Sequence, residues 1–253
     1  QFNLSFAAIP RKTGKTVINI SESELSLINS IRQGFTVSNW TVDRLCRVWL
    51  LLRMDPSDKQ HYLKAIDNLF LTAEMNELVA LYSSLPLLAY PQSWKMRCAE
   101  GIRSNIGTVL EAIMCNNPYP SENLDEPAWN QLVLKAFFTE KPVHLIIGLD
   151  QRRNQQLANI LTDYAHERWV AHRPVNPQLW RCVGKYLDEK TFSDIEKPFR
   201  SDNEEEQQAA ALACSDSNYA PAQKLLDQSP YKAMIQSGEL TWNKLAEKIQ
   251  PVV

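Results

Sequence analysis

Acidic, basic and aromatic side chains gather in the stretch DYAHERWVAHRPV, residues 163–175. Asp163 and His166 are three residues apart, and on a helix this spacing brings two side chains close enough for acid–base catalysis or for sharing a metal ion. Arg168 and His172 could instead hold an anion, because a guanidinium is always charged and donates hydrogen bonds in a fixed fork. The chemistry therefore depends on which sides of the helix these residues occupy.

A helix over residues 155–172 places Asp163 and His166 on its solvent-facing side. At about 100° per residue the apolar side chains share the opposite face, and they are Leu157, Ile160, Leu161, Tyr164, Ala165 and Ala171. A metal ion would need further ligands, which His144 and Asp150 could supply only if their loop folded back. We therefore predict no metal site and keep Asp163 and His166 as the candidates for a catalytic acid or base.

Arg168 falls within the apolar face of the same predicted helix, and His172 follows one turn later. A buried guanidinium requires an acidic partner or an anionic ligand, because it does not lose its proton. One alternative is an internal ion pair with Asp125, Glu126 or Asp150 on a neighbouring element. The other alternative is a pocket that recognises an anion.

A second helix, beginning near Pro127, would supply part of such a pocket. Its apolar residues occupy almost every side, so we expect it to be central and covered by other helices. Lys135 on this helix would then have to reach solvent, pair with an acid or meet a ligand. The polar residues that could converge on a ligand are Asn130, Gln131, Lys135, Asp150, Arg153, Arg168 and His172.

Helices must position these residues. The chain has only seven glycines against 14 prolines, and alternating β-branched runs are nearly absent. Capping signals mark several helix starts, and they are SESE at 21–24, Thr41, Asp55 with Pro56, DEPAW at 125–129, NPQLW at 176–180, SDNEEEQQ at 201–208 and TWNKLAEKI at 241–249. We predict an all-α fold of about ten short helices, either an irregular α-solenoid or a compact multi-helix bundle. The only candidate strands are KTVINI (15–20) and VHLIIGL (143–149), and the second could equally be a buried helical turn.

The chain is long enough for one large domain or two small ones. We predict a single all-helical domain over residues 1–253. It consists of an extended N-terminal segment at 1–20, the polar region at 116–188 and C-terminal helices at 201–250.

Composition and motifs argue against several classes of function. The net charge of −2 gives no overall basic field for nucleic acid, and no apolar run is long enough for stable membrane insertion. TGKT at 13–16 lacks the earlier glycine of a phosphate-binding loop, since Ile9 occupies that position. The five cysteines form no CxxC pair, which favours buried thiols in a reducing compartment. We expect a cytoplasmic protein without a cofactor.

Four motifs in the polar region 116–188 carry a resemblance to a known family. They are DEPAWNQLVLKAFF (125–138), IIGLD (146–150), DYAHERW (163–169) and LWRCVG (179–184). Together they resemble the EboA family. The resemblance continues more loosely through EEEQQAAALAC and LTWNKLAEKI, and it is weak before residue 90. Arg152 and Arg153 stand side by side where the family pattern shows one arginine, which leaves open which of them corresponds to it.

The resemblance implies a part in secondary metabolism. Members of this family are encoded in the ebo gene cluster of cyanobacteria and other bacteria, together with a UbiA-like prenyltransferase, a TatD-like hydrolase and a protein like a sugar-phosphate cyclase. The cluster is associated with making or exporting secondary metabolites, including delivery of a scytonemin precursor to the periplasm. The resemblance supplies no catalytic residues.

We therefore expect a non-catalytic accessory protein that binds a metabolite or a partner enzyme through a polar pocket in residues 116–188. The expected partners are other proteins of the cluster or a small anionic metabolite. One alternative is an enzyme acting on a phosphorylated or carboxylated intermediate, with Lys135 and Arg168 holding the anion. The other is a pure helical scaffold. The arrangement of the polar residues distinguishes these hypotheses. Binding or catalysis requires these residues to face one concave pocket, whereas a scaffold does not.

Overall fold

The computed structural model describes residues 2–249 and confirms the all-α prediction. Within these residues lie 16 α-helices and five 3₁₀ segments, more than the sequence predicts, because many are only one or two turns long. Neither candidate strand forms within these residues. The first segment makes one isolated bridge, Val17 to Thr41. The second begins with the 3₁₀ turn η3 (Val143–Leu145), which agrees with the alternative of a helical turn, and makes another bridge, Ile146 to Cys115. No helix in the described part of the chain is both long and apolar enough to cross a membrane.

The chain divides into two compact units. Unit 1 comprises residues 1–132 and 145–147, and unit 2 comprises residues 133–144 and 148–253. The single domain over residues 1–253 stays a prediction. The expected extended segment at the N-terminus is wrong, since α1 (Phe2–Thr13) is a helix that packs against α3 (Val42–Leu52) and buries Phe6.

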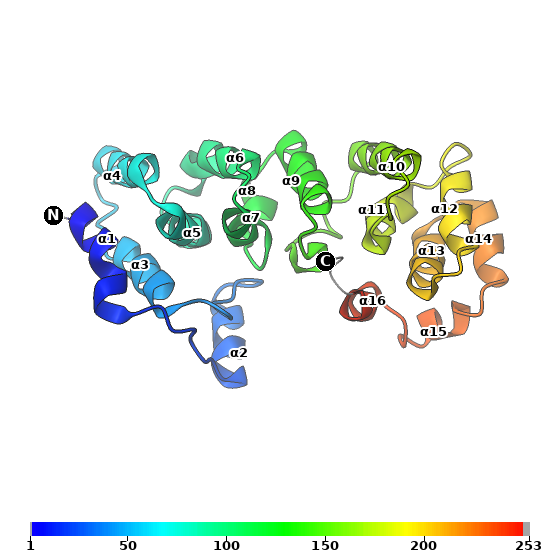
Figure 1. Ribbon diagram of the computed structural model, residues 1–253, viewed down its shortest axis with the longest axis horizontal. Coiled ribbons are helices and arrows are strands. Elements are labelled where there is room, and N and C mark those ends of the chain that lie inside the picture. Colours follow the sequence, from blue (N-terminus) through cyan, green and yellow to red (C-terminus); the bar gives the residue numbers. More distant parts are fainter. Residues whose placement is uncertain (1, 250–253) are drawn as a thin grey trace. The chain divides into compact units, whose positions relative to one another are not determined.

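Unit 1 is built from short helices in sequence order (Figure 1), and they are α1, α2 (Glu22–Ile31), α3, α4 (Lys59–Thr72), α5 (Met75–Ser84), η1 (Leu85–Leu87), η2 (Pro91–Trp94), α6 (Lys95–Arg103), α7 (Gly107–Met114) and α8 (Tyr119–Asn123). α3 packs against α5, and α7 packs against both α5 and α6. The cap predicted at Ser21 is confirmed, because Ser21 and Glu24 form a reciprocal capping box. The helix start predicted at Asp55 is wrong, because Asp55 accepts from Ser57 in a turn and Asp58 caps α4.

α9 (Glu126–Phe138) and η3 (Val143–Leu145) cross the division between the units. The predicted cap at Asp125 is confirmed, since its carboxylate accepts from the Ala128 amide at 3.0 Å. The expectation that this helix is covered on every side is wrong. Phe138 is 66% exposed and Gln131 is exposed as well.

Unit 2 contains the remaining helices (Figure 1), and they are α10 (Gln155–Val170), η4 (Pro177–Leu179), α11 (Trp180–Val183), η5 (Gly184–Tyr186), α12 (Phe192–Phe199), α13 (Glu204–Asp216), α14 (Ala220–Asp227), α15 (Lys232–Gln236) and α16 (Trp242–Lys248). The predicted starts at Asn176 and Thr241 are confirmed by side-chain caps. α13 begins at the predicted acidic turn, capped by Asn203.

The covered helix of unit 2 is α13. It packs against α11, α12, α14 and α16, and all residues from Gln208 to Cys214 are buried. Small side chains make this possible, because alanine lets neighbouring backbones approach closely. A Cβ atom on Gly184 would lie 2.6 Å from the Ala213 carbonyl oxygen, so only glycine fits at this crossing.

Candidate functional site: the polar network of unit 2

Asp163 and His166 both lie on the exposed side of α10, as predicted. They are not directed to a common site, however. His166 Nε2 lies 2.8 Å from Asp194 Oδ1 on α12, so its hydrogen-bond partner is Asp194. Among residues 2–249, no group of three or more histidine, cysteine, aspartate or glutamate side chains is placed to hold a metal ion.

Trp169 lies beside His166 at the centre of an aromatic cluster. Its ring stacks on buried Trp180 with a centroid separation of 5.9 Å, and the His166 ring lies 5.7 Å away. Lys197 of α12 places its Nζ 3.9 Å from the Trp169 ring centroid, a cation–π contact. These contacts hold α12 against α10, and His166 and Lys197 take part in them.

Arg168 lies at the edge of the buried face of α10 and is half-buried. Its Nε donates to the Pro174 carbonyl at 2.9 Å, and it also contacts Tyr164. Burial raises the pKa of Tyr164, and the Arg168 charge offsets part of that rise. The alternative of an ion pair at Arg168 is wrong, because no carboxylate within the described residues pairs with it. Its Nε bonds the carbonyl of Pro174 in the loop that follows α10 instead.

His172 ends α10 in a left-handed backbone conformation, with φ of 53°. The His172 amide donates to Trp169 O at 3.0 Å, and the Arg173 amide donates to Arg168 O at 2.8 Å. This pair of hydrogen bonds is a Schellman motif, in which glycine usually occupies the position that His172 fills. The side chain of His172 is exposed.

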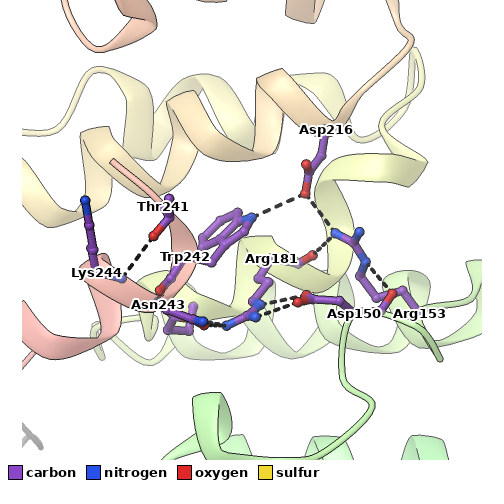
Figure 2. Close-up of polar contacts among 9 residues, drawn as sticks. Asp150, Arg153, Arg181, Asp216, Thr241, Trp242, Asn243 and Lys244 are labelled. Atoms are coloured by element: carbon purple, nitrogen blue, oxygen red, sulfur yellow. Dashed lines mark hydrogen bonds and ion pairs between the residues drawn. The ribbon is translucent and has the colours of Figure 1, made fainter. Parts of the chain in front are cut away.

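The buried cation of this region is Arg181 on α11, whose side chain is 8% exposed. Its Nε and Nη2 donate to the two carboxylate oxygens of Asp150 at 2.7 and 2.5 Å. Its Nη1 donates to Asn243 Oδ1 at 3.2 Å and points to Gln178 Oε1 at 3.5 Å (Figure 2). The bidentate pair fixes the loop before α10 to α11, and the contact with Asn243 joins α11 to α16.

Arg153 forms the second half of the network (Figure 2). Its Nη1 donates both to the Arg181 carbonyl and to Asp216 Oδ2, each at 2.8 Å, while its Nε donates to the Asp150 carbonyl at 3.1 Å. The Trp242 indole donates to the same Asp216 oxygen at 3.3 Å. Asp216 ends α13 and Trp242 begins α16, so the two arginines join the loop before α10 to the C-terminal helices.

The charges of the network shift two pKa values. Burial raises the pKa of Asp150, but the hydrogen bonds from Arg181 and the charges of Arg181 and Arg153 outweigh it, and the pKa lies below its ordinary value. Burial lowers the pKa of His144, and the nearby Arg181 charge lowers it further against the effect of Glu247. Asp150 is therefore an anion at neutral pH, and His144 is neutral.

The predicted ligand-binding residues do not all lie in one unit. Asn130 is buried and Gln131 exposed on the part of α9 that belongs to unit 1. The other five belong to unit 2, and they are Lys135, Asp150, Arg153, Arg168 and His172. The structure brings Asp150 and Arg153 together in the network. Convergence of the full set on one pocket stays a prediction.

Sequence reasoning missed Arg181, Asp216 and the α16 residues Trp242 and Asn243. Arg181 stands between Trp180 and Cys182, and all three are buried. An arginine enclosed by apolar neighbours in LWRCVG was the available signal. A helix of four residues is too short for a periodicity argument, so the signal went unused.

Comparison with known proteins gives one family. The family model described as "Metabolite traffic protein EboA" matches residues 1–184. The match therefore includes the N-terminal part, where the resemblance in sequence is weak, and it ends before α12. Neither the curated proteins nor the solved structures contain a significant match. Since the matched range spans most of the chain, this protein belongs to the EboA family of metabolite traffic proteins.

Proposed function

We propose that this protein is a non-catalytic accessory protein of metabolite traffic, which binds a small anionic metabolite or a partner enzyme through polar residues of the region 116–188. The observation that supports it best is the network of Arg153, Arg181, Asp150 and Asp216 (Figure 2). These four charges are bonded to one another across three segments of unit 2, which are the loop before α10, α11 and the end of α13. They serve as a rigid framework that positions other groups for binding.

The environment of two buried cysteines also supports binding over catalysis. Burial raises the pKa of the Cys182 thiol to about 12, although Arg153 and Arg181 lie nearby. A thiol with this pKa is protonated at neutral pH and is a poor nucleophile. Cys214 has its pKa raised to about 12 by burial as well.

The end of α10 provides the donors for binding in this proposal. Arg168 is half-buried there, and His172 and Arg173 are exposed. Together these three basic side chains present hydrogen-bond donors to an anionic group. Such a group would be a phosphate or a carboxylate of the metabolite.

A binding experiment tests this proposal. Thermal unfolding of the full chain is followed with inorganic phosphate and with prenyl diphosphates, and we expect stabilisation that grows with ligand concentration. Arg168→Gln should reduce the stabilisation, whereas Arg200→Gln, which removes an exposed arginine just after α12, should leave it unchanged. Equal stabilisation of both variants would show that the ligand binds without Arg168. No stabilisation of the unmodified chain, together with no complex with other proteins of the cluster, would favour a pure scaffold.

A second candidate function, an enzyme, is favoured by one observation. His166 is held by the Asp194 carboxylate at 2.8 Å, which is how a general base is commonly oriented. In this alternative Lys135 and Arg168 hold an anionic intermediate. Turnover of a phosphorylated or carboxylated substrate that is lost in His166→Asn and retained in Lys197→Gln would establish it.

We place the protein in the cytoplasm, and fractionation of cells that produce it tests that placement.

A further inference from the structure

Arg44 of α3 occupies an unusual environment in unit 1. It is half-buried, and its Nε donates to Ser83 Oγ of α5 at 2.9 Å. The central carbon of its guanidinium lies 4.1 Å from the centroid of the Trp40 ring. The guanidinium is therefore held on one flat face by an aromatic ring and at one edge by a hydroxyl group.

Five other arginines that are buried or half-buried meet a carboxylate directly. The pairs are Arg32 with Glu122, Arg47 with Asp43, Arg97 with Asp67, Arg153 with Asp216 and Arg181 with Asp150. Arg44 forms no ion pair with any residue in the range 2–249. Among the described residues its Nη1 and Nη2 atoms have no hydrogen-bond partner, and the residue is only half-buried. The outer edge of this guanidinium thus has donors available to a ligand.

The charge of Arg44 is poorly compensated by the protein. Burial lowers its pKa to about 10, and the nearby charge of Glu111 offsets only part of that effect. The side chain is still a cation at neutral pH. Its partial burial therefore destabilises the charge, and no bonded counter-ion offsets this effect. An external anion would supply that counter-ion.

The platform beneath Arg44 is firmly held. Trp40 is buried, and the edge of the Phe35 ring packs against it with a centroid separation of 5.7 Å. The Trp40 carbonyl accepts from the Ile18 amide at 2.9 Å. Ser83 Oγ donates in turn to the Val79 carbonyl, which leaves its lone pair directed to Arg44. A preorganised guanidinium loses little further freedom when an anion binds.

We propose that Arg44, stacked on Trp40 and oriented by Ser83, is an anion-binding site of unit 1 that recognises a phosphate or carboxylate group of a small molecule. The two Nη groups lie in one plane and match the spacing of two oxygens on such a group. This site is separate from the region 116–188, and it goes beyond the function proposed for that region.

Binding of defined anions to the full chain tests the site. Inorganic phosphate and benzoate are titrated separately, so that the two arms distinguish a phosphate from a carboxylate ligand, and affinity is measured by calorimetry. Arg44→Gln should weaken binding about tenfold or more, since a bidentate charge-assisted contact is lost. Arg44→Lys keeps the charge but loses the fork, and it should weaken binding by a smaller factor. Arg53→Gln, at the exposed end of the same helix, is the matched control and should bind like the unmodified chain.

A second measurement covers the case in which Arg44→Gln fails to fold. The Nε–H signal of Arg44 in ¹⁵N-resolved spectra of the unmodified chain should shift in a saturable manner as the anion is added. Ser83→Ala, which retains Arg44 but removes its orienting acceptor, should weaken binding severalfold. Equal affinity in the folded Arg44→Gln variant and the unmodified chain would overturn the proposal. So would the absence of any saturable shift of the Arg44 signal with both anions.

Discussion

At the scale of the residue, the central contrast is between Arg168 and Arg181. A helical wheel selects Arg168 as the cation that requires an acidic partner, but Arg168 lies at the edge of the buried face and bonds a carbonyl. Arg181 is the enclosed cation, and it meets Asp150 through two hydrogen bonds. Buried ion pairs specify how segments fit together, because removing one partner leaves the other charge buried and uncompensated.

This contrast predicts a large loss of stability in Asp150→Ala. The variant leaves the Arg181 guanidinium buried, with only Gln178 and Asn243 as acceptors. We expect the free energy of unfolding to fall by about 2 kcal/mol or more, somewhat less than for a fully enclosed pair because Asp150 keeps some solvent contact. Denaturation by urea measures the change. Asp227→Ala, which removes an exposed ion pair with Lys232, is the control and should cost less than about 1 kcal/mol.

The lowered pKa of Asp150 also predicts a dependence of stability on pH. A carboxyl whose pKa is lower in the folded than in the unfolded chain stabilises the fold fully above its unfolded value, which is ordinarily 3.8. This contribution is lost as the pH falls through the lower folded pKa. Asp150→Asn should therefore lose less stability between pH 5 and acid than the unmodified chain does. Parallel loss in the two proteins would contradict the assignment.

At the scale of the element, the sequence predicts helix starts better than helix ends or helix burial. Ser21, Asn176 and Thr241 cap helices where predicted, because their side chains satisfy local amide groups and depend little on distant packing. Burial depends on partners that sequence does not show. The apolar α9 exposes Phe138, while the alanine-rich α13 is enclosed by four helices, since small residues permit close crossings.

The end of α10 gives a prediction at this scale. His172 adopts a positive φ in the Schellman motif, a conformation that strains any residue with a Cβ atom. His172→Gly should therefore raise the free energy of unfolding by up to about 1 kcal/mol. Thermal or urea unfolding measures the gain. If the same variant also weakens anion binding, His172 serves function at a cost in stability. If the variant is less stable than the unmodified chain, the strain argument is wrong.

At the scale of the whole molecule, the C-terminal helices supply hydrogen-bond partners to residues that the family model matches. Arg153 and Arg181 lie within the matched residues, whereas Asp216 and Asn243, which bond them, lie beyond residue 184. Sequence could not reveal this dependence, because the partners are separated by some 60 residues and no motif links them. The network predicts that the C-terminal segment stabilises unit 2 selectively.

Removal of residues 240–253 tests this selectivity and the division into two units. The shortened chain lacks Trp242 and Asn243 of the network and uncovers the face of α13 that packs against α16. We expect faster amide hydrogen exchange throughout residues 148–239 and unchanged protection in residues 2–132, because local unfolding follows the loss of local contacts. Glu239→Ala, at an exposed position just before the deletion, should leave both regions protected. Equal loss of protection in both units would show that they fold as one cooperative domain, which is what the sequence predicts.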